Sequence, residues 1–152
     1  MTQSNDTVQP TSTGTLAWVG PFAVFALWLA VDKALPIANP AKDMLRDGVL
    51  LAYIRHTSAS LVIQENADPD VQTDLVTALQ HVAPANAGWV HDTEGPDDMP
   101  AHIKAMVNGV SLHVPVAGGK LALGTWQGIY VAEHRARPHQ REVLLSFIGS
   151  KR

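Results

Sequence analysis

Side chains that bind metals or move protons gather in short segments of this chain. The sequence HDTEGPDDMPAH, residues 91–102, places two histidines and four acidic residues within twelve positions. Imidazole and carboxylate groups are the ligands that zinc and similar divalent ions take when a protein offers no thiolate, and this chain has no cysteine. We expect Glu94–Lys104 and Leu123–Glu133 to form two halves of one buried polar site, a metal-assisted one.

His56 and the polar residues that follow it form a further candidate group. His56 comes directly after an apolar strand-like run, with Ser58 and Ser60 close behind it. His56, His91 and His102 are candidates for one shared site, because each stands at an expected element boundary beside other polar groups. The alternative is that each is a surface or hydrogen-bonded core histidine. A Ser–His–Asp arrangement is a weaker alternative, since neither serine lies in the Gly-x-Ser-x-Gly pattern of a nucleophile elbow.

The segment Gly124–Gly128, with sequence GTWQG, has two interpretations. In the structural one, the glycines permit a bend while Trp126 packs in the core. In the functional one, the glycines let backbone N–H groups approach an anion, and Gln127 hydrogen-bonds a ligand. The two interpretations are compatible, and both stay open.

Length and charge limit the class of protein. A chain of 152 residues that is 46% hydrophobic and 16% charged is typical of one packed domain. The formal net charge of −3 argues against a nucleic-acid or anionic-lipid partner. The absence of cysteine excludes disulfides and a cysteine nucleophile.

The apolar segment Leu16–Val31 contains no charge and is interrupted by Gly20 and Pro21. It falls short of the roughly 20 apolar residues that span a bilayer. We therefore expect a buried helix over Ala23–Leu35, with a membrane anchor as the less favoured alternative. The polar residues 1–14 are interpreted as a flexible tail, which leaves 15–152 as the single domain.

Periodicity and turn residues predict the remaining elements. Strands are expected over 49–55, 58–64, 111–116, 120–123, 128–134 and 142–148. Helices are expected over 69–82, capped by Asp68, and from a cap at Asp98 to about Asn108, after a long loop over 84–100. Strands and helices in no regular alternation predict an α+β domain with mainly antiparallel pairing.

Four segments of the sequence resemble the YjbQ-type secondary thiamine-phosphate synthase family. They are HTSASLVIQENADPDVQTDL (56–75), HDTEGPDDMPAHIKA (91–105), SLHVPVAGGKLALGTWQGIYVAEHR (111–135) and REVLLSFIG (141–149). The resemblance is clearest over 47–149 and is lost before about Asp43. It implies a cytoplasmic, homotrimeric α+β sandwich of mixed, mainly antiparallel sheets, with sites close to subunit contacts.

The resemblance also assigns roles to residues. It implies a catalytic set of His56, Glu94, His102, Gln127 and Glu133, and a substrate-binding set of Asn66, Asp68 and Arg141. Arg55 is added to the substrate-binding set, because a cation near the phosphates would stabilise a departing diphosphate. It implies a divalent metal, zinc or a similar ion, on His56, His91 and His102, with His134 as a further candidate for the site.

The activity that the resemblance implies joins a pyrimidine diphosphate to a thiazole phosphate and releases pyrophosphate. The partner would then be a small phosphorylated metabolite. The alternative is a non-catalytic trimer that binds a metal or a phosphorylated metabolite in the same pocket.

Overall fold

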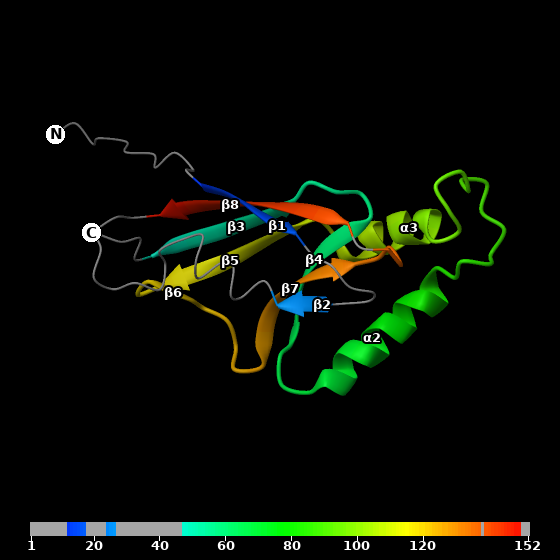
Figure 1. Ribbon diagram of the computed structural model, residues 1–152. Coiled ribbons are helices and arrows are strands. Elements are labelled where there is room, and N and C mark those ends of the chain that lie inside the picture. The colour runs from blue at the N-terminus through cyan, green and yellow to red at the C-terminus, as the bar shows by residue number, and fades with distance from the viewer. Residues whose placement is uncertain (1–11, 18–23, 27–46, 138, 150–152) are drawn as a thin grey trace.

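The structure is a computed structural model that describes residues 12–17, 24–26, 47–137 and 139–149. Within these residues the strands form two sheets, and two helices follow one another at one end of the molecule (Figure 1). The strands are β1 (Ser12–Ala17), β2 (Val24–Ala26), β3 (Gly48–Ile54), β4 (Ala59–Glu65), β5 (Ser111–Ala117), β6 (Lys120–Leu121), β7 (Gln127–Glu133) and β8 (Gln140–Gly149). The helices are α2 (Pro69–Val82) and α3 (Asp98–Asn108).

The larger sheet has the order β1-β8-β3-β5-β6, and the smaller sheet has the order β2-β7-β4. Every strand pair among the described residues is antiparallel, so the mixed pairing expected from the resemblance is not found there. The α+β class is confirmed. Each sheet joins strands from distant parts of the chain, which brings the start of β4 and the end of β7 close to α3 (Figure 1).

The hydrophobic core lies between the inner faces of the two sheets. Alternation along β3 buries Leu50, Ala52 and Ile54, and the antiparallel register places Phe147, Leu145 and Val143 of β8 beside them. The smaller sheet contributes its own buried side chains, which are Ala59, Leu61 and Ile129. Because alternate residues of a strand point to opposite faces, the period-two pattern of the sequence is sufficient to build this core.

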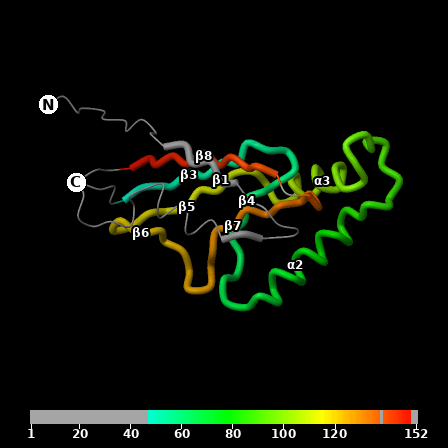
Figure 2. Tube along the Cα trace, in the orientation of Figure 1, coloured from blue at the N-terminus to red at the C-terminus, as the bar shows by residue number. Residues whose placement is uncertain are grey.

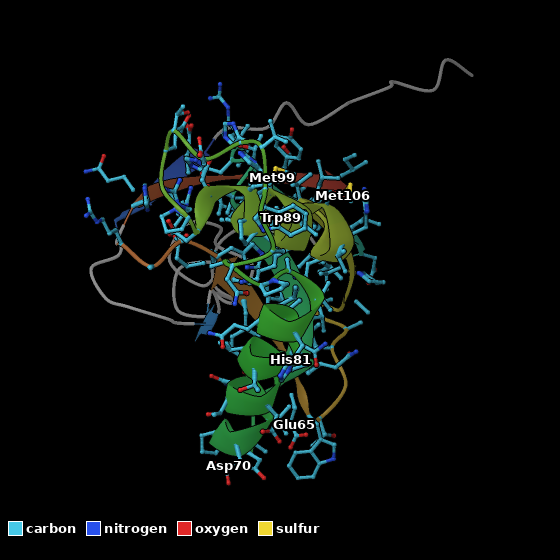
Figure 3. All side chains as sticks on the ribbon, turned by 90° about the vertical axis from the view of Figure 1, so that its right-hand side faces the viewer. Glu65, Asp70, His81, Trp89, Met99 and Met106 are labelled. Atoms are coloured by element: carbon cyan, nitrogen blue, oxygen red, sulfur yellow. The ribbon has the colours of Figure 1, made fainter. Side chains whose placement is uncertain are left out.

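Helix α2 matches its predicted bounds, and its predicted cap is confirmed. Oδ1 of Asp68 accepts a hydrogen bond from the backbone N–H of Asp70 at 2.9 Å, and Pro69 occupies the first turn. None of the residues of α2 is buried. The helix extends from the sheets, with Asp70 at its far end and His81 nearer to α3 (Figure 3).

Helix α3 also has its predicted bounds, but the prediction that Asp98 caps it is wrong. The capping position is Asp97, which makes no side-chain capping bond, and Asp98 is the first residue of the helix. The side chain of Asp98 is engaged elsewhere by two histidines and an arginine. Figure 2 follows the long connection from α2 through residues 83–97 to this helix.

The N-terminal expectations fall largely outside the described residues. Where the structure describes them, Ser12–Ala17 is a strand that overlaps the expected tail, and Val24–Ala26 is a strand within the expected helix Ala23–Leu35. The helix prediction is therefore wrong at Val24–Ala26, where apolar β-branched and aromatic residues pair with β7. Among the described residues, no helix has both the length and the apolar character needed to cross a membrane.

Candidate metal centre

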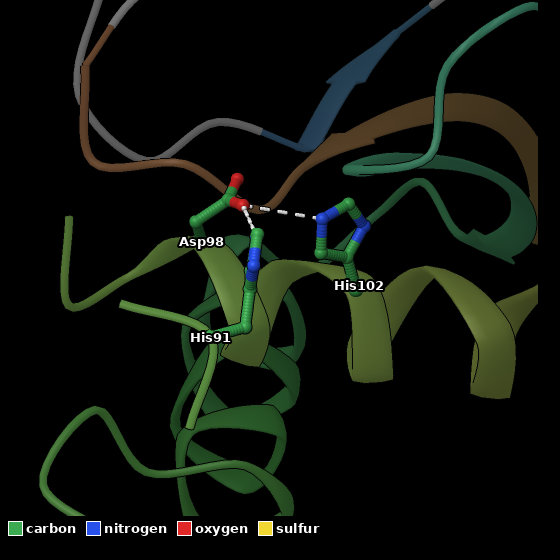
Figure 4. Close-up of side chains that lie close together, drawn as sticks. All are labelled: His91, Asp98 and His102. Atoms are coloured by element: carbon green, nitrogen blue, oxygen red, sulfur yellow. Dashed lines mark hydrogen bonds and ion pairs between the residues drawn. The ribbon is translucent and has the colours of Figure 1, made fainter. Parts of the chain in front are cut away.

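Two histidines meet one carboxylate oxygen where the long loop joins α3 (Figure 4). Nε2 of His91 lies 2.8 Å from Oδ2 of Asp98, and Nε2 of His102 lies 3.2 Å from the same oxygen. Asp98 and His102 are separated by one helical turn, so they share a face of α3. The two imidazole rings are tilted by 51° with their centroids 5.6 Å apart, so they approach the oxygen from different directions. One potential ligand atom from each residue lies within 4.8 Å of the others.

The tautomer of His102 follows from its hydrogen bonds. Its Nδ1 lies 3.0 Å from the carbonyl oxygen of Thr57, and a carbonyl only accepts, so Nδ1 carries a proton. In the neutral ring Nε2 therefore holds a lone pair, and it faces an anionic oxygen of Asp98. Two acceptors are stable at this distance only with a proton or a cation between them. The backbone of Thr57 thus fixes the orientation of His102, with its Nε2 directed at Asp98.

Asp98 is a buried carboxylate that stays ionised. Burial raises its pKa, but the hydrogen bond from His91 and the charges of Arg135 and His102 outweigh that effect and hold the pKa below its ordinary value. Its residue is only 2% exposed. A buried anion of this kind needs a cationic partner, and Arg135 supplies it, while the two histidines add polar contacts to Oδ2.

Arg135 follows β7 and binds the opposite side of the cluster. Its Nη1 donates to Oδ1 of Asp98, and its Nε donates to Oδ2 of Asp97 at 3.1 Å. Its Nη2 donates to the carbonyl oxygen of Glu94 at 2.8 Å. The hydrogen bond from the backbone N–H of Ala136 and the charge of Arg135 lower the pKa of Asp97 more than burial raises it.

A cavity of about 580 Å³ opens beside this cluster, and His102 belongs to both. It is lined by Tyr53, Arg55, His56, Thr57, His102, Ala105, Met106 and Val110. Cationic or polar groups from the β3–β4 connection thus face an apolar wall from α3. This combination suits a small ligand that has an anionic group and an apolar body.

His56 lies on the cavity wall but outside the group of converging ligand atoms. Its Nε2 accepts a hydrogen bond of 2.8 Å from the backbone N–H of Glu142, so in the neutral ring Nδ1 carries the proton. Burial, followed by the charge of Arg141, lowers the pKa of His56, which favours that neutral ring. Of the three histidines assigned to the metal, the structure brings together His91 and His102, with Asp98 in place of His56.

Glu133 and Arg141 form an ion pair inside the molecule. Nε of Arg141 donates to Oε2 of Glu133 at 2.7 Å, and Nη2 donates to Oε1 at 2.5 Å. Nη1 of Arg141 also donates to Oγ of Ser58 at 3.2 Å. The residue Arg141 is 5% exposed. Arg141 and Glu133 are thus engaged inside the molecule, whereas Arg55 lines the cavity, is exposed and pairs with Glu142 at 3.1 Å.

His134 is buried and pairs with Ser60. Oγ of Ser60 lies 2.8 Å from Nε2 of His134. Burial, followed by the charge of Lys104, lowers the pKa of His134 to about 4. Ser60 has no exposed surface, so this pair offers no nucleophile to a substrate. Ser58, the other serine of the Ser–His–Asp alternative, accepts a hydrogen bond from Arg141 and contacts no histidine in the hydrogen bonds of the described residues.

The segment Leu123–Glu133 does not gather at one site within a single chain. In the register of β4 and β7, Ala59 pairs with Glu133 and Glu65 pairs with Gln127. The strand rise of about 3.3 Å per residue separates Gln127 from Glu133 by about 20 Å. Within one chain, the Gln127 end of this segment therefore lies apart from the Asp98 cluster, and only its Glu133 end approaches it.

Asn66, Asp68 and Gln127 occupy that opposite end. Nδ2 of Asn66 donates to the carbonyl oxygen of Gln127 at 3.2 Å, and Oε1 of Gln127 accepts from the N–H of Gly124 at 2.8 Å. Glu94 lies nearer the cluster, but its residue is exposed and it contributes its carbonyl oxygen to Arg135. Trp126 is 64% exposed, so the interpretation that it packs in the core is wrong.

The sequence placed Asp98 in the acidic candidate segment and at a helix start but did not single it out as a ligand, and it gave Arg135 no role in the centre. The spacing of Asp98 and His102 on a predicted helix was a usable signal, because residues four apart share a helical face. No comparable signal marks Arg135, which reaches the cluster only because β7 ends beside α3.

Comparisons with known proteins agree with the fold and the motifs. The family model described as UPF0047 protein YjbQ-like matches residues 36–150. A UPF0047 protein of Synechocystis is 51% identical over 106 residues, which are 69% of this chain and 72% of the relative. The UPF0047 protein YjbQ of Salmonella typhimurium is 48% identical over 102 residues, which are 67% of this chain and 74% of the relative.

A solved structure gives the same result. A conserved protein of the YjbQ/UPF0047 family from Clostridium acetobutylicum is 34% identical, with a TM-score of 0.76, and the match covers 90% of this chain and 98% of that one. The names of these relatives state no reaction, so membership alone assigns none. The chain belongs to the YjbQ/UPF0047 family.

Proposed function

We propose that this protein is a metal-dependent enzyme acting on a phosphorylated small molecule, with a divalent ion of the zinc class on His91, Asp98 and His102. The convergence of two Nε2 atoms on one buried carboxylate oxygen carries this proposal. Metal–ligand bonds of about 2.0–2.2 Å place neighbouring ligand atoms of a tetrahedral ion about 3.4 Å apart. The observed 2.8 and 3.2 Å need to widen only slightly to admit the ion.

Three protein ligands leave one position of a tetrahedral ion for substrate, and the bound ion would act as a Lewis acid on a phosphate oxygen. The protein side chains have separate tasks. Arg55 presents a guanidinium at the cavity wall, where it can donate to an anionic group. Ala105, Met106 and Val110 offer an apolar surface to the body of the substrate.

The reaction that we propose is thiamine-phosphate synthesis, and the family resemblance of the motifs supports it. A carbon–nitrogen bond forms between the pyrimidine methylene carbon and the thiazole nitrogen, while the carbon–oxygen bond to the diphosphate breaks. Pyrophosphate leaves with that electron pair. Stabilising the departing diphosphate is the main electrostatic task, and cations in the cavity wall suit it.

We further propose that the protein works as a homotrimer. Tyr53 beside the cavity and Met106 and Val107 on α3 keep large apolar surfaces exposed in the single chain. Aromatic and methionine side chains of this kind are enriched in protein interfaces. Packing of a neighbouring copy against them would place the cavity near a subunit contact.

One set of measurements tests these proposals together. The purified protein would be analysed for bound metal and for its mass in solution, where three times the chain mass of 16.3 kDa is expected. A cell that lacks thiamine-phosphate synthase would then be complemented with the wild type, with His102→Ala, and with His81→Ala as a control on the exposed end of α2.

The expected result is bound metal and rescue for both the wild type and His81→Ala. His102→Ala should show neither bound metal nor rescue. Unchanged metal content and rescue in His102→Ala would exclude the centre. Metal binding with no rescue by the wild type would reject this reaction and favour a binding protein or another substrate.

A further inference from the structure

Arg135 holds the segment that carries the cluster in place through three different groups. Its guanidinium donates to side chains at Asp97 and Asp98 and to the backbone carbonyl of Glu94. Its own backbone N–H donates to Oε1 of Glu133 at 2.9 Å, which joins it to the buried ion pair. The side chain of Arg135 is 13% exposed, so water competes little for these bonds.

The two oxygens of Asp98 have separate partners. Oδ1 accepts from Arg135, whereas Oδ2 faces both histidines. The terminal torsion of an aspartate side chain is broad, so packing on α3 alone does not select which oxygen faces His102. The bond from Arg135 makes that selection and presents Oδ2 to His91 and His102.

Arg135 also determines where the loop lies. His91 stands in a segment without regular secondary structure, whereas Asp98 and His102 belong to α3. The bonds of Arg135 to Glu94 and Asp97 fasten the part of the chain between them to the end of β7, and the N–H of Ala136 adds a 2.8 Å bond to Asp97. The separation between the two histidines therefore depends on a residue that ligates nothing itself.

We propose that Arg135 is a positioning residue of the metal centre, fixing the carboxylate of Asp98 and the loop of His91 in the geometry that ligates a divalent ion. The inference depends on the proposed function, because it concerns the same ion. By positioning the ligands, Arg135 would raise the affinity for the ion, whereas its positive charge alone would lower that affinity.

Charge and position predict opposite effects when Arg135 is removed. A guanidinium next to a cation site repels the ion, so electrostatics alone predict tighter binding in Arg135→Met. Loss of positioning predicts weaker binding, by the roughly 10–100-fold that outer contacts of metal ligands typically contribute. The sign of the change therefore separates the two roles.

The experiment measures Zn²⁺ affinity by competition with a chromophoric chelator, and the visible absorption of bound Co²⁺ as a report of ligand geometry. The proteins are the full-length wild type, Arg135→Met, Arg135→Lys, and Arg137→Met as a matched control. Arg137 is an exposed arginine two residues further along the chain. Circular dichroism would show that each variant is folded.

The expected loss is about 10–100-fold for Arg135→Met, with a changed Co²⁺ spectrum, and wild-type behaviour for Arg137→Met. Arg135→Lys keeps the charge but lacks the planar fork, so it should also bind more weakly than the wild type. If Arg135→Met does not fold, the lysine variant decides the question. Wild-type affinity in Arg135→Lys, or equal or tighter binding in Arg135→Met, would overturn the positioning role. A wild type that binds no ion would instead reject the proposed function.

Discussion

His134 makes the stability of the fold depend on pH. Its pKa of about 4 lies below the ordinary 6.5, because the buried ring is costly to charge and Lys104 lies near it. Between those two values the unfolded chain takes up a proton that the folded chain refuses. The contribution of neutral His134 to the free energy of unfolding is therefore complete above pH 6.5 and is lost as the pH falls towards 4. The difference between its pKa in the folded and the unfolded chain corresponds to about 3 kcal/mol.

We expect His134→Gln to remove that share of the pH dependence. Glutamine can keep a hydrogen bond to Ser60 without titrating, so its free energy of unfolding should fall less than that of the wild type between pH 6.5 and 4.5. Urea denaturation across this range measures the difference. His81→Gln, at an exposed position of α2, should keep the wild-type profile. Identical pH profiles for His134→Gln and the wild type would contradict the assignment.

At the scale of single residues, the sequence indicated which side chains gather but not how they bond. His91 and His102 could be predicted because a short loop and a helix start bring them together locally. The tautomer of His56 could not be predicted, because it depends on the backbone N–H of Glu142, which lies 86 residues further along the chain. The role of Arg135 likewise required a contact over 37 residues to Asp98.

At the scale of elements, the junction of β3 and β8 is sensitive to added volume at Gly48. A Cβ atom at this position would lie 2.3 Å from the carbonyl oxygen of Ile148 and 2.7 Å from Cα of Gly149. Both are backbone atoms of a paired strand, so neither can rotate away. Overpacking of this kind costs about 1–3 kcal/mol.

We therefore expect Gly48→Ala to lower the free energy of unfolding by about 1–3 kcal/mol, as measured by urea denaturation. Gly124→Ala is the matched control, because the atoms nearest to its Cβ would belong to the flexible side chain of Gln127, at 3.4 Å or more. The two variants should differ clearly. Equal stability in both would show that the β3–β8 junction can spread to accept a methyl group.

Elements with a strong local pattern were predicted well. The bounds of α2 and its cap followed from Asp68, Pro69 and an apolar stripe of helical period. The strand over Val24–Ala26 was missed, because the uncharged run around it is compatible with either a helix or a buried strand. Only pairing with β7, a distant part of the chain, separates these alternatives.

At the scale of the whole molecule, the order of strands could not be predicted from composition or periodicity. The larger sheet places the last strand between the first and the third, and the smaller one joins β2, β7 and β4. Such pairings link residues that are far apart in sequence, and local propensity does not encode them. The α+β class was predictable, whereas the approach of the segment after β7 to the start of α3, which brings Arg135 to Asp98, was not.

Binding of an ion at the proposed ligands would add to the stability of the whole fold. The proposed ligands join the loop of residues 83–97 to α3, so an ion bound there favours the folded chain over the unfolded one. At a free concentration 100 times the dissociation constant, a ligand specific for the folded state adds about 2.7 kcal/mol. For a protein of this size, that corresponds to a rise of about 5–10 °C in Tm.

We expect chelator-stripped protein to gain this thermal stability when Zn²⁺ is restored, as followed by circular dichroism. His91→Ala should lose the gain, because it removes a ligand on an exposed loop and leaves the core intact. His113→Ala, on the exposed face of β5, should retain it. A rise in Tm that is equal in His91→Ala and the wild type would mean that the ion stabilises the molecule from another place, and the cluster would then be a structural network of hydrogen bonds around Asp98.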